Sequence, residues 1–241
     1  MIALYRIMLR TSVTRGRLLA FLAGGALLDL IAYSIRVSDY ANRENDWYAL
    51  LDLAGLALYI PVVALVFSTS SLGDLAQDGT LAQDGTLVYF WLRPVARWKV
   101  VVIALAATLT VTLPLTLGPV WLAVWLAGVS WQAFWAITVS TALANGAYVA
   151  VFTAFGLRVR HALIFGLGYV LIWEAAIATI GKGPAAISIR HYAESLFAHL
   201  GNQTVPGAAM VDQWPSVIVL VTVAVAGAAL TTFLLARQDV A

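Results

Sequence analysis

Three acidic side chains interrupt long apolar runs of this sequence and are its most unusual candidates for chemistry. They are Asp29, Asp52 and Glu174. An Asp at the centre of a membrane helix costs about 2.5–3.5 kcal/mol on insertion scales, so such a side chain needs a partner, a proton or water. No Lys or Arg falls within the same apolar runs to serve as that partner. We consider two interpretations of the three acids: a polar lining of a substrate pathway, or a structural role through placement at the membrane interface or hydrogen bonding to Ser, Thr or Tyr neighbours.

The other reactive residue types form no recognisable catalytic or metal-binding pattern. His191 and Glu194 are three residues apart and His199 lies five further on, a poor spacing for a shared metal, and we expect none. There is no cysteine, and the sequence lacks the G-x-S-x-G, H-E-x-x-H and G-x-x-x-x-G-K-[ST] motifs. The sequence therefore predicts that this chain is not itself an enzyme.

The composition is that of a chain whose solvent is lipid. Of 241 residues, 62% are hydrophobic and only 11% are charged, against roughly 25% charged residues in a typical soluble domain. The mean hydropathy is +0.89. These values exclude a soluble globular enzyme and a disordered chain, and the net charge of +2 does not indicate a nucleic-acid partner.

Six apolar segments are long enough to cross a bilayer, for which a helix needs about 20 residues. They are 18–35, 47–70, 100–127, 132–157, 162–180 and 216–236. The third and fourth come from one stretch without formal charge, which we divide at Gly128-Val129-Ser130 because it is too long for one helix. The fold class predicted is an all-α integral membrane protein, with residues 1–241 forming a single transmembrane domain.

Lys and Arg predict the orientation, since they favour the cytoplasmic side. With six spans and a cytoplasmic N-terminus, ten of the 14 Lys and Arg residues lie inside: Arg6, Arg10, Arg15, Arg17, Arg93, Arg97, Lys99, Arg158, Arg160 and Arg237. Four lie outside: Arg36, Arg43, Lys182 and Arg190. We expect a multi-pass protein of the cell membrane with both termini in the cytoplasm.

Two segments outside the spans are predicted to be helical and to lie at the membrane surface. In 1–16, Met1, Leu4, Tyr5 and Met8 recur at helical spacing away from Arg6 and Arg10, which indicates an interfacial helix; an unstructured tail is the alternative. In the external segment 181–214, a helical apolar stripe precedes the last span: Ile189, Tyr192, Leu196, Phe197 and Leu200. We expect this second helix to lie on the outer surface or to dip into it.

The cytoplasmic segment 71–99 carries the most distinctive local sequence. Leu-Ala-Gln-Asp-Gly-Thr occurs twice in succession, at 75–80 and 81–86, and three aromatic residues follow: Tyr89, Phe90 and Trp91. Asp84 or Thr86 can cap a short helix that Pro94 limits. Consecutive aromatic residues on a cytoplasmic helix favour contact with the membrane interface or another protein, with packing under the bundle as the alternative.

This segment and the order of the elements resemble the permease subunit of ATP-binding-cassette exporters. The similarity covers the layout of the whole chain and is sharpest over residues 83–98. Its motif is an acidic-Gly-Thr-Leu group followed by Arg-Pro-Val-x-Arg: Asp84, Gly85, Thr86, Leu87, Arg93, Pro94, Val95 and Arg97. The six-residue duplication departs from the family pattern and leaves the start of the loop undefined.

The resemblance implies a role for the loop and a set of partners. Its coupling helix, including Tyr89, Phe90 and Trp91, would contact a separate cytoplasmic ATPase, which would bind the ATP and Mg²⁺; this chain would hold no cofactor. A second permease copy or a sister subunit would complete the transporter. A secondary transporter or channel is the alternative, and an intramembrane enzyme and a structural anchor are further rivals.

Overall fold

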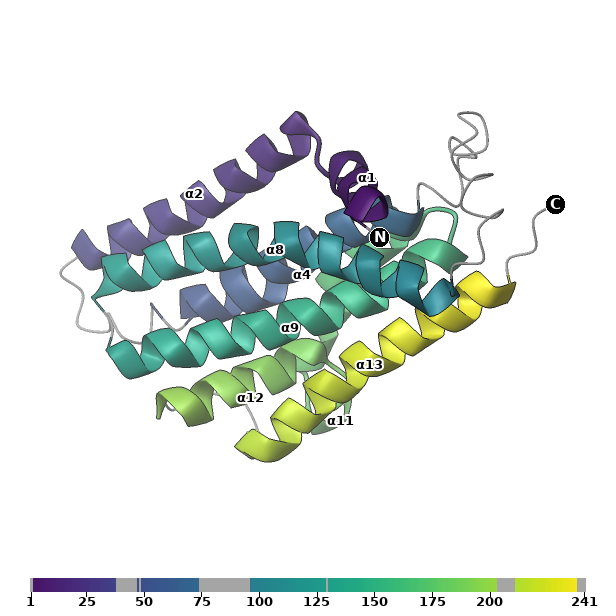
Figure 1. Cartoon of the computed structure of the whole chain (residues 1–241). Coiled ribbons are helices and arrows are strands. Elements are labelled where there is room, and N and C mark those ends of the chain that lie inside the picture. The colour runs from purple at the N-terminus through teal and green to yellow at the C-terminus, as the bar shows by residue number, and fades with distance from the viewer. Residues whose placement is uncertain are drawn as a thin grey trace.

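The computed structural model is helical, and it describes residues 2–37, 47, 49–73, 96–128, 130–202 and 211–237. Within these ranges there is no strand. The helices, shown in Figure 1, are α1 (Ile2–Ser12), α2 (Arg15–Val37), η1 (Leu50–Tyr59), α4 (Ile60–Ser68), η2 (Thr69–Gly73), α8 (Arg97–Ala127), α9 (Trp131–Arg158), α10 (Ala162–Gly168), η3 (Tyr169–Glu174), η4 (Ile177–Thr179), α11 (Lys182–Ala185), α12 (Ile189–Gly201) and α13 (Gln213–Arg237).

Five of the described helices are long and apolar enough to cross a membrane, which makes this a multi-pass membrane protein. They are Arg15–Val37, Leu50–Ser71, Arg97–Ala127, Trp131–Arg158 and Gln213–Arg237. The second is assembled from η1, α4 and η2, which run on as one helix. α8 has 31 residues, or about 46 Å at 1.5 Å per residue, so it extends beyond a hydrocarbon core of about 30 Å.

The third and fourth spans are separated at the expected turn for clear local reasons. Gly128 follows α8 with a φ of 69°, a left-handed conformation that glycine adopts without steric cost. Ser130 then caps α9 by accepting a hydrogen bond of 3.3 Å from the backbone N–H of Ala133. Both ends of this turn agree with the boundaries predicted from the sequence.

The fifth apolar segment differs from the single span expected over 162–180. Its apolar helix, made of α10 and η3, covers only Ala162–Glu174, about 20 Å. The chain then turns through η4 and α11, and α12 begins at Ile189. α12 does not lie on a surface: it packs against α9, η1 and α13, and most of its side chains are buried.

The two halves of this broken helix together follow α9 from one end to the other. α10 begins just after α9 ends at Arg158. At the far end, the Gln132 side chain at the start of α9 donates a 3.0 Å hydrogen bond to the Leu200 carbonyl of α12. The halves meet between these points, where side-chain and backbone atoms of Glu174 contact Ser188, Ile189 and Arg190.

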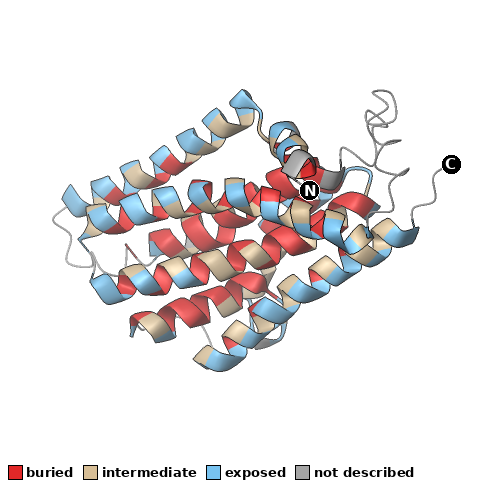
Figure 2. Ribbon diagram, viewed as in Figure 1, coloured by how far each residue is buried: buried red, intermediate tan, exposed pale blue. Residues whose placement is uncertain are grey.

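Helix α9 forms the centre of the bundle, with α8, α4, α12 and α13 packed around it (Figure 1). Small residues allow the closest of these contacts. A Cβ atom on Gly227 of α13 would lie 2.8 Å from the backbone carbon of Ala150. Burial is concentrated on α4, α9 and α12, whereas α2 and α13 expose apolar side chains along their length, as Figure 2 shows. Exposed apolar helix faces are expected where the solvent is lipid.

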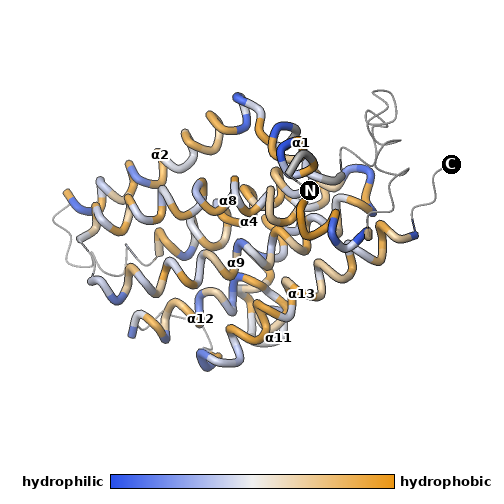
Figure 3. Tube along the Cα trace, viewed as in Figure 1, coloured by the Kyte–Doolittle hydropathy of each residue, from blue (hydrophilic) through white to orange (hydrophobic). Residues whose placement is uncertain are grey.

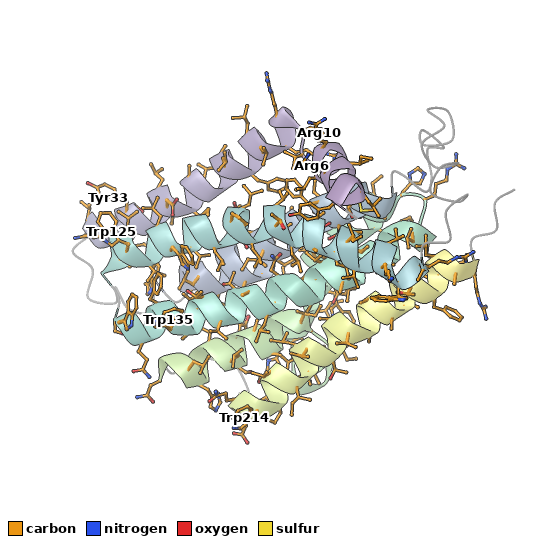
Figure 4. The ribbon with its side chains drawn as sticks, in the orientation of Figure 1. Arg6, Arg10, Tyr33, Trp125, Trp135 and Trp214 are labelled. Atoms are coloured by element: carbon orange, nitrogen blue, oxygen red, sulfur yellow. The ribbon has the colours of Figure 1, made fainter. Side chains whose placement is uncertain are left out.

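The two ends of the bundle differ in residue type. Tyr33, Trp125, Trp135 and Trp214 lie at one end and are all exposed, whereas Arg6 and Arg10 lie toward the other (Figure 4). Figure 3 shows that the hydrophilic residues gather mainly near the ends of the long helices, with apolar residues between. We call the end of the bundle with Tyr33, Trp125, Trp135 and Trp214 the aromatic end, and the opposite end the arginine end. Interfacial aromatic residues and basic flanks are typical of proteins that span a bilayer.

Helix α1 lies near the arginine end and packs its apolar face on α8. Leu4 and Met8 are buried against Ala104 and Ala107. The Tyr5 hydroxyl donates a 2.8 Å hydrogen bond to Thr110. The residues 2–12 thus form a helix with one buried face, as the spacing predicts.

The contact between α13 and α9 gives a direct test of the packing. Gly227→Ala forces a methyl group into the backbone of Ala150, and overpacking of this kind costs about 1–3 kcal/mol. Gly146→Ala on α9 is the matched control, because no atom lies within 4 Å of the added Cβ. We expect thermal unfolding in detergent to show a lower melting temperature for the first variant alone. Equal effects of the two substitutions would contradict this packing.

Candidate functional site

Two of the three predicted acids, Asp52 and Glu174, come together around a residue expected on the outer surface. That residue is Arg190, which is 6% exposed and lies in the first turn of α12. None of the predicted apolar runs contains this cation: it comes from the segment 181–214, whose helix we expected to lie on the outer surface or to dip into it. Instead, α12 is inserted into the bundle, which brings its basic residue to η1 and η3.

Glu174 joins the two halves of the broken helix. Its carboxylate accepts four hydrogen bonds: from the Tyr169 hydroxyl at 2.8 Å, the Ser188 hydroxyl at 2.5 Å, the Ile189 N–H at 3.2 Å and the Arg190 N–H at 3.4 Å. The last two are free N–H groups of the first turn of α12, where a negative charge is favoured by the helix dipole. The carboxylate therefore caps α12 from another helix.

The backbone is shaped to deliver Glu174 to this position. The helix widens over η3, and the Ala175 N–H bonds the Val170 carbonyl five residues earlier at 3.0 Å. Such π-helical turns are frequent at functional sites. On the other side, Ser188 caps α12 by accepting a 3.2 Å bond from the His191 N–H while its hydroxyl donates to Glu174.

Arg190 forms the ionic centre of the site. Its Nε and Nη2 donate to the two carboxylate oxygens of Asp52 at 3.2 and 2.7 Å, a bidentate arrangement. Nε also bonds Glu194, one turn along α12. Nη1 donates to the backbone carbonyl of Glu174 at 3.2 Å. One guanidinium thus ties η1, η3 and α12 together, and we call Asp52, Glu174, Arg190 and Glu194 the ionic cluster.

The cluster has more acid than base. If Asp52, Glu174 and Glu194 were all ionised, the single Arg190 would leave a net charge of −2 in a largely buried site. The side chains of Arg190 and Glu194 are only 7% and 10% exposed, while that of Asp52 is 25% exposed. Removing charges from water is costly unless they are paired. The arrangement can therefore hold helices together, present charge to a polar ligand or bind a proton.

A buried tyrosine completes the surroundings of Glu174. Tyr148 on α9 is fully buried and lies close enough to Glu174 and Tyr169 to interact with them electrostatically. Its hydroxyl has no hydrogen-bond partner among the described residues. A buried hydroxyl without a hydrogen bond of good geometry is uncommon, and this one could still donate or accept a hydrogen bond beside the cluster.

The third predicted acid, Asp29, lies apart from the cluster. It is on α2, half-buried, beside Tyr59, and its Oδ1 atom is buried without a partner in the part of the chain that the structure describes. The Tyr59 hydroxyl lies 3.0 Å from the Phe21 carbonyl and 2.9 Å from the Leu115 carbonyl. The three acids therefore do not share one lining.

No metal centre is visible over the described ranges, where no three His, Cys, Asp or Glu side chains lie close enough to hold an ion. The histidines considered from the sequence have other surroundings. The His191 ring packs edge-on against Tyr192, and His199 lies 3.9 Å from the exposed Asp212.

Most of the predicted coupling residues lie outside the described residues: Asp84, Gly85, Thr86, Tyr89, Phe90, Trp91, Arg93 and Pro94. Arg97 is described and begins α8. Its guanidinium donates hydrogen bonds to the carbonyls of Leu235, at 3.1 Å, and Ala236 in the last turn of α13. A basic side chain at the C-terminus of a helix complements its dipole.

Comparison with known proteins adds no relative: neither the protein-family models nor the curated proteins contain a match to this chain.

Sequence reasoning found Asp52 and Glu174 but missed most of their partners: Tyr148, Tyr169, Ser188, Arg190 and Glu194. Two local signals were available. Ser188 stands directly before the apolar stripe of α12, a typical N-cap position, and Arg190 and Glu194 have the i, i+4 spacing of a helical ion pair. Neither signal indicates that the helix is buried.

The cluster predicts an unequal response to two identical substitutions. Arg190→Gln leaves buried carboxylates without their cation, and breaking a buried pair in this way costs about 3–5 kcal/mol. Arg36→Gln is the control, because Arg36 is exposed and makes a 2.7 Å bond to the Leu126 carbonyl; its loss should be at most about 1 kcal/mol. Unfolding measured in one detergent checks the difference, and similar losses would contradict a structural role for Arg190.

Proposed function

We propose that this chain is the membrane-spanning permease subunit of an ATP-binding-cassette transporter, acting as an exporter. In this proposal ATP and Mg²⁺ bind to a separate cytoplasmic ATPase, and the chain itself catalyses no reaction. A second copy or a sister permease pairs with it in the cell membrane. Both termini and the loop 71–99 face the cytoplasm, and the broken fifth helix provides one of six crossings.

The observation that carries the proposal is the loop sequence, together with where its described ends lie. Residues 83–98 contain the motif that resembles a coupling segment. Gly73 ends η2, which contacts α1 and the C-terminal part of α9, and Arg97 bonds the last turn of α13. The loop therefore leaves and re-enters the bundle at the arginine end, the end expected to face the cytoplasm.

The long helices supply a mechanical basis for coupling. α8 is one helix from Arg97 to Ala127, with Pro114 and Pro119 inside it, so a displacement at the arginine end would be carried along a helix of about 46 Å toward the aromatic end. Arg97 links this helix to α13, so both move when the loop is pushed. A partner that closes on ATP would thereby tilt at least two spans, both of which pack along the central α9.

A secondary transporter or channel stays the second candidate, and one observation favours it. Broken membrane helices whose free ends meet charged groups form the ion and substrate sites of many secondary transporters. The junction of η3 and α12 at Glu174 has this character. The two functions differ in their energy source, which is what the experiment must address.

The test is to identify a cytoplasmic ATPase that copurifies with the chain, to express the two together, and to measure complex formation and ATP-dependent transport. We expect the triple variant Tyr89→Ala/Phe90→Ala/Trp91→Ala to reduce the stimulation of the ATPase at least about tenfold, which corresponds to about 1.4 kcal/mol of coupling. The matched control replaces three exposed aromatics at the aromatic end, Tyr33, Trp125 and Trp214, and should keep the stimulation.

Two results would contradict the proposal. One is full transport and complex assembly by the loop variant. The other is transport that continues without any ATPase and follows an ion gradient, which would favour the secondary transporter.

A further inference from the structure

In the ionic cluster, hydrogen bonds from neutral donors compensate the negative charge of one carboxylate only. Glu174 accepts four hydrogen bonds and faces the N-terminus of α12, so its negative charge is compensated by neutral donors. Asp52 and Glu194 have no comparable set of donors among the described residues. They share Arg190, which carries one positive charge at any accessible pH.

The geometry divides this one positive charge unequally. Asp52 binds the guanidinium through both oxygens, at 2.7 and 3.2 Å, whereas Glu194 is bonded through one oxygen only. Glu194 is also the more buried of the two side chains. Arg190 thus pairs with both carboxylates through the same Nε–H group, and Glu194, the more buried of the two, competes with Asp52 for the one positive charge in a site with little water.

We propose that Asp52 and Glu194 form a proton-binding site, in which the Glu194 carboxyl carries one exchangeable proton beside the Asp52–Arg190 ion pair. With that proton the three groups are neutral; without it they carry one negative charge. Two interacting carboxyl groups that share a buried site cannot both ionise at low cost. Over the described residues, no three His, Cys, Asp or Glu side chains lie close enough to hold a metal ion.

The groups that face this site come from each element packed against it. Two of these elements contribute almost nothing. In α9 up to Leu157 and in α13 up to Ala236, Tyr148 is the single titratable residue. The titratable and charged neighbours are Asp52 on η1, Tyr148 on α9, Tyr169 and Glu174 on η3, and Arg190 and His191 on α12. The Tyr148 hydroxyl is fully buried beside Glu174 and makes no hydrogen bond of good geometry with the described residues.

Asp52 provides the route for exchange. It is the most exposed member of the cluster, at 25% of its side chain, and it lies in the first turn of a helix that ends at the arginine end. The proton therefore exchanges through Asp52 toward the aromatic end. Its loss places two negative charges against each other across η1 and α12, which weakens the attraction that holds α12 in the bundle.

Infrared spectroscopy of the full chain in lipid nanodiscs tests this directly, because a protonated carboxyl group has its own carbonyl band. The chain has three glutamates: Glu44, Glu174 and Glu194. We expect a band of a neutral carboxyl group that disappears as the pH rises and that shifts when glutamate is labelled with ¹³C at the carboxyl carbon. The band should be absent from Glu194→Gln and kept by the matched control Glu44→Gln.

A second variant keeps the test sharp if Glu194→Gln does not fold. Asp52→Asn leaves Arg190 to Glu194 alone, so Glu194 ionises and its band is lost although Glu194 is still present. Asp212→Asn, at a side chain that is 91% exposed, is the control and keeps the band. Absence of a label-shifted band in the wild type, or its survival in either cluster variant, overturns the proposal. The measurement needs no ATPase, so its failure leaves the proposed permease function untouched.

Discussion

The structure depends on a single requirement: a positive charge buried among apolar helices must be surrounded by compensating groups. Arg190 meets it through Asp52, Glu194 and the Glu174 carbonyl. These contacts come from three separate elements, so the guanidinium fixes how η1, η3 and α12 lie against one another. In a medium where water cannot replace a lost partner, such an arrangement leaves little freedom.

Several other features follow from this requirement. Glu174 reaches the first turn of α12 from the end of the first half of the broken fifth helix, and the widened turn before Ala175 lies where it does so. α12 is buried on most sides because its charged residues belong to the cluster. Around this centre the packing is ordinary for a membrane bundle, with small residues such as Gly227 permitting close helix contacts.

The lengths of the apolar segments and the turn residues between them made most of the fold predictable. The uncharged stretch around Gly128 was too long for one helix, and Gly128-Val129-Ser130 marked the turn between two. The buried position of α12 was not predictable, because its composition, with Arg190, His191 and Glu194, is that of a surface helix. Only the tertiary contact with Asp52, 138 residues away in sequence, makes this composition compatible with burial. The coupling segment carries a sequence motif, but residues 74–95 lie outside the described structure, so its role rests on the motif.

Helix α9 links the ionic cluster to the helices that move in the proposed permease function, because it packs on both halves of the broken helix and on α13. A double-mutant cycle between Asp52 and Arg190 tests the central claim most directly. Unfolding free energies are measured for the wild type, Asp52→Asn, Arg190→Gln and the double variant in one bilayer mimetic. If the pair organises the bundle, the double variant loses less than the sum of the single losses, by about 0.5–3 kcal/mol. Additivity within about 0.3–0.5 kcal/mol, the behaviour of independent sites, would contradict it.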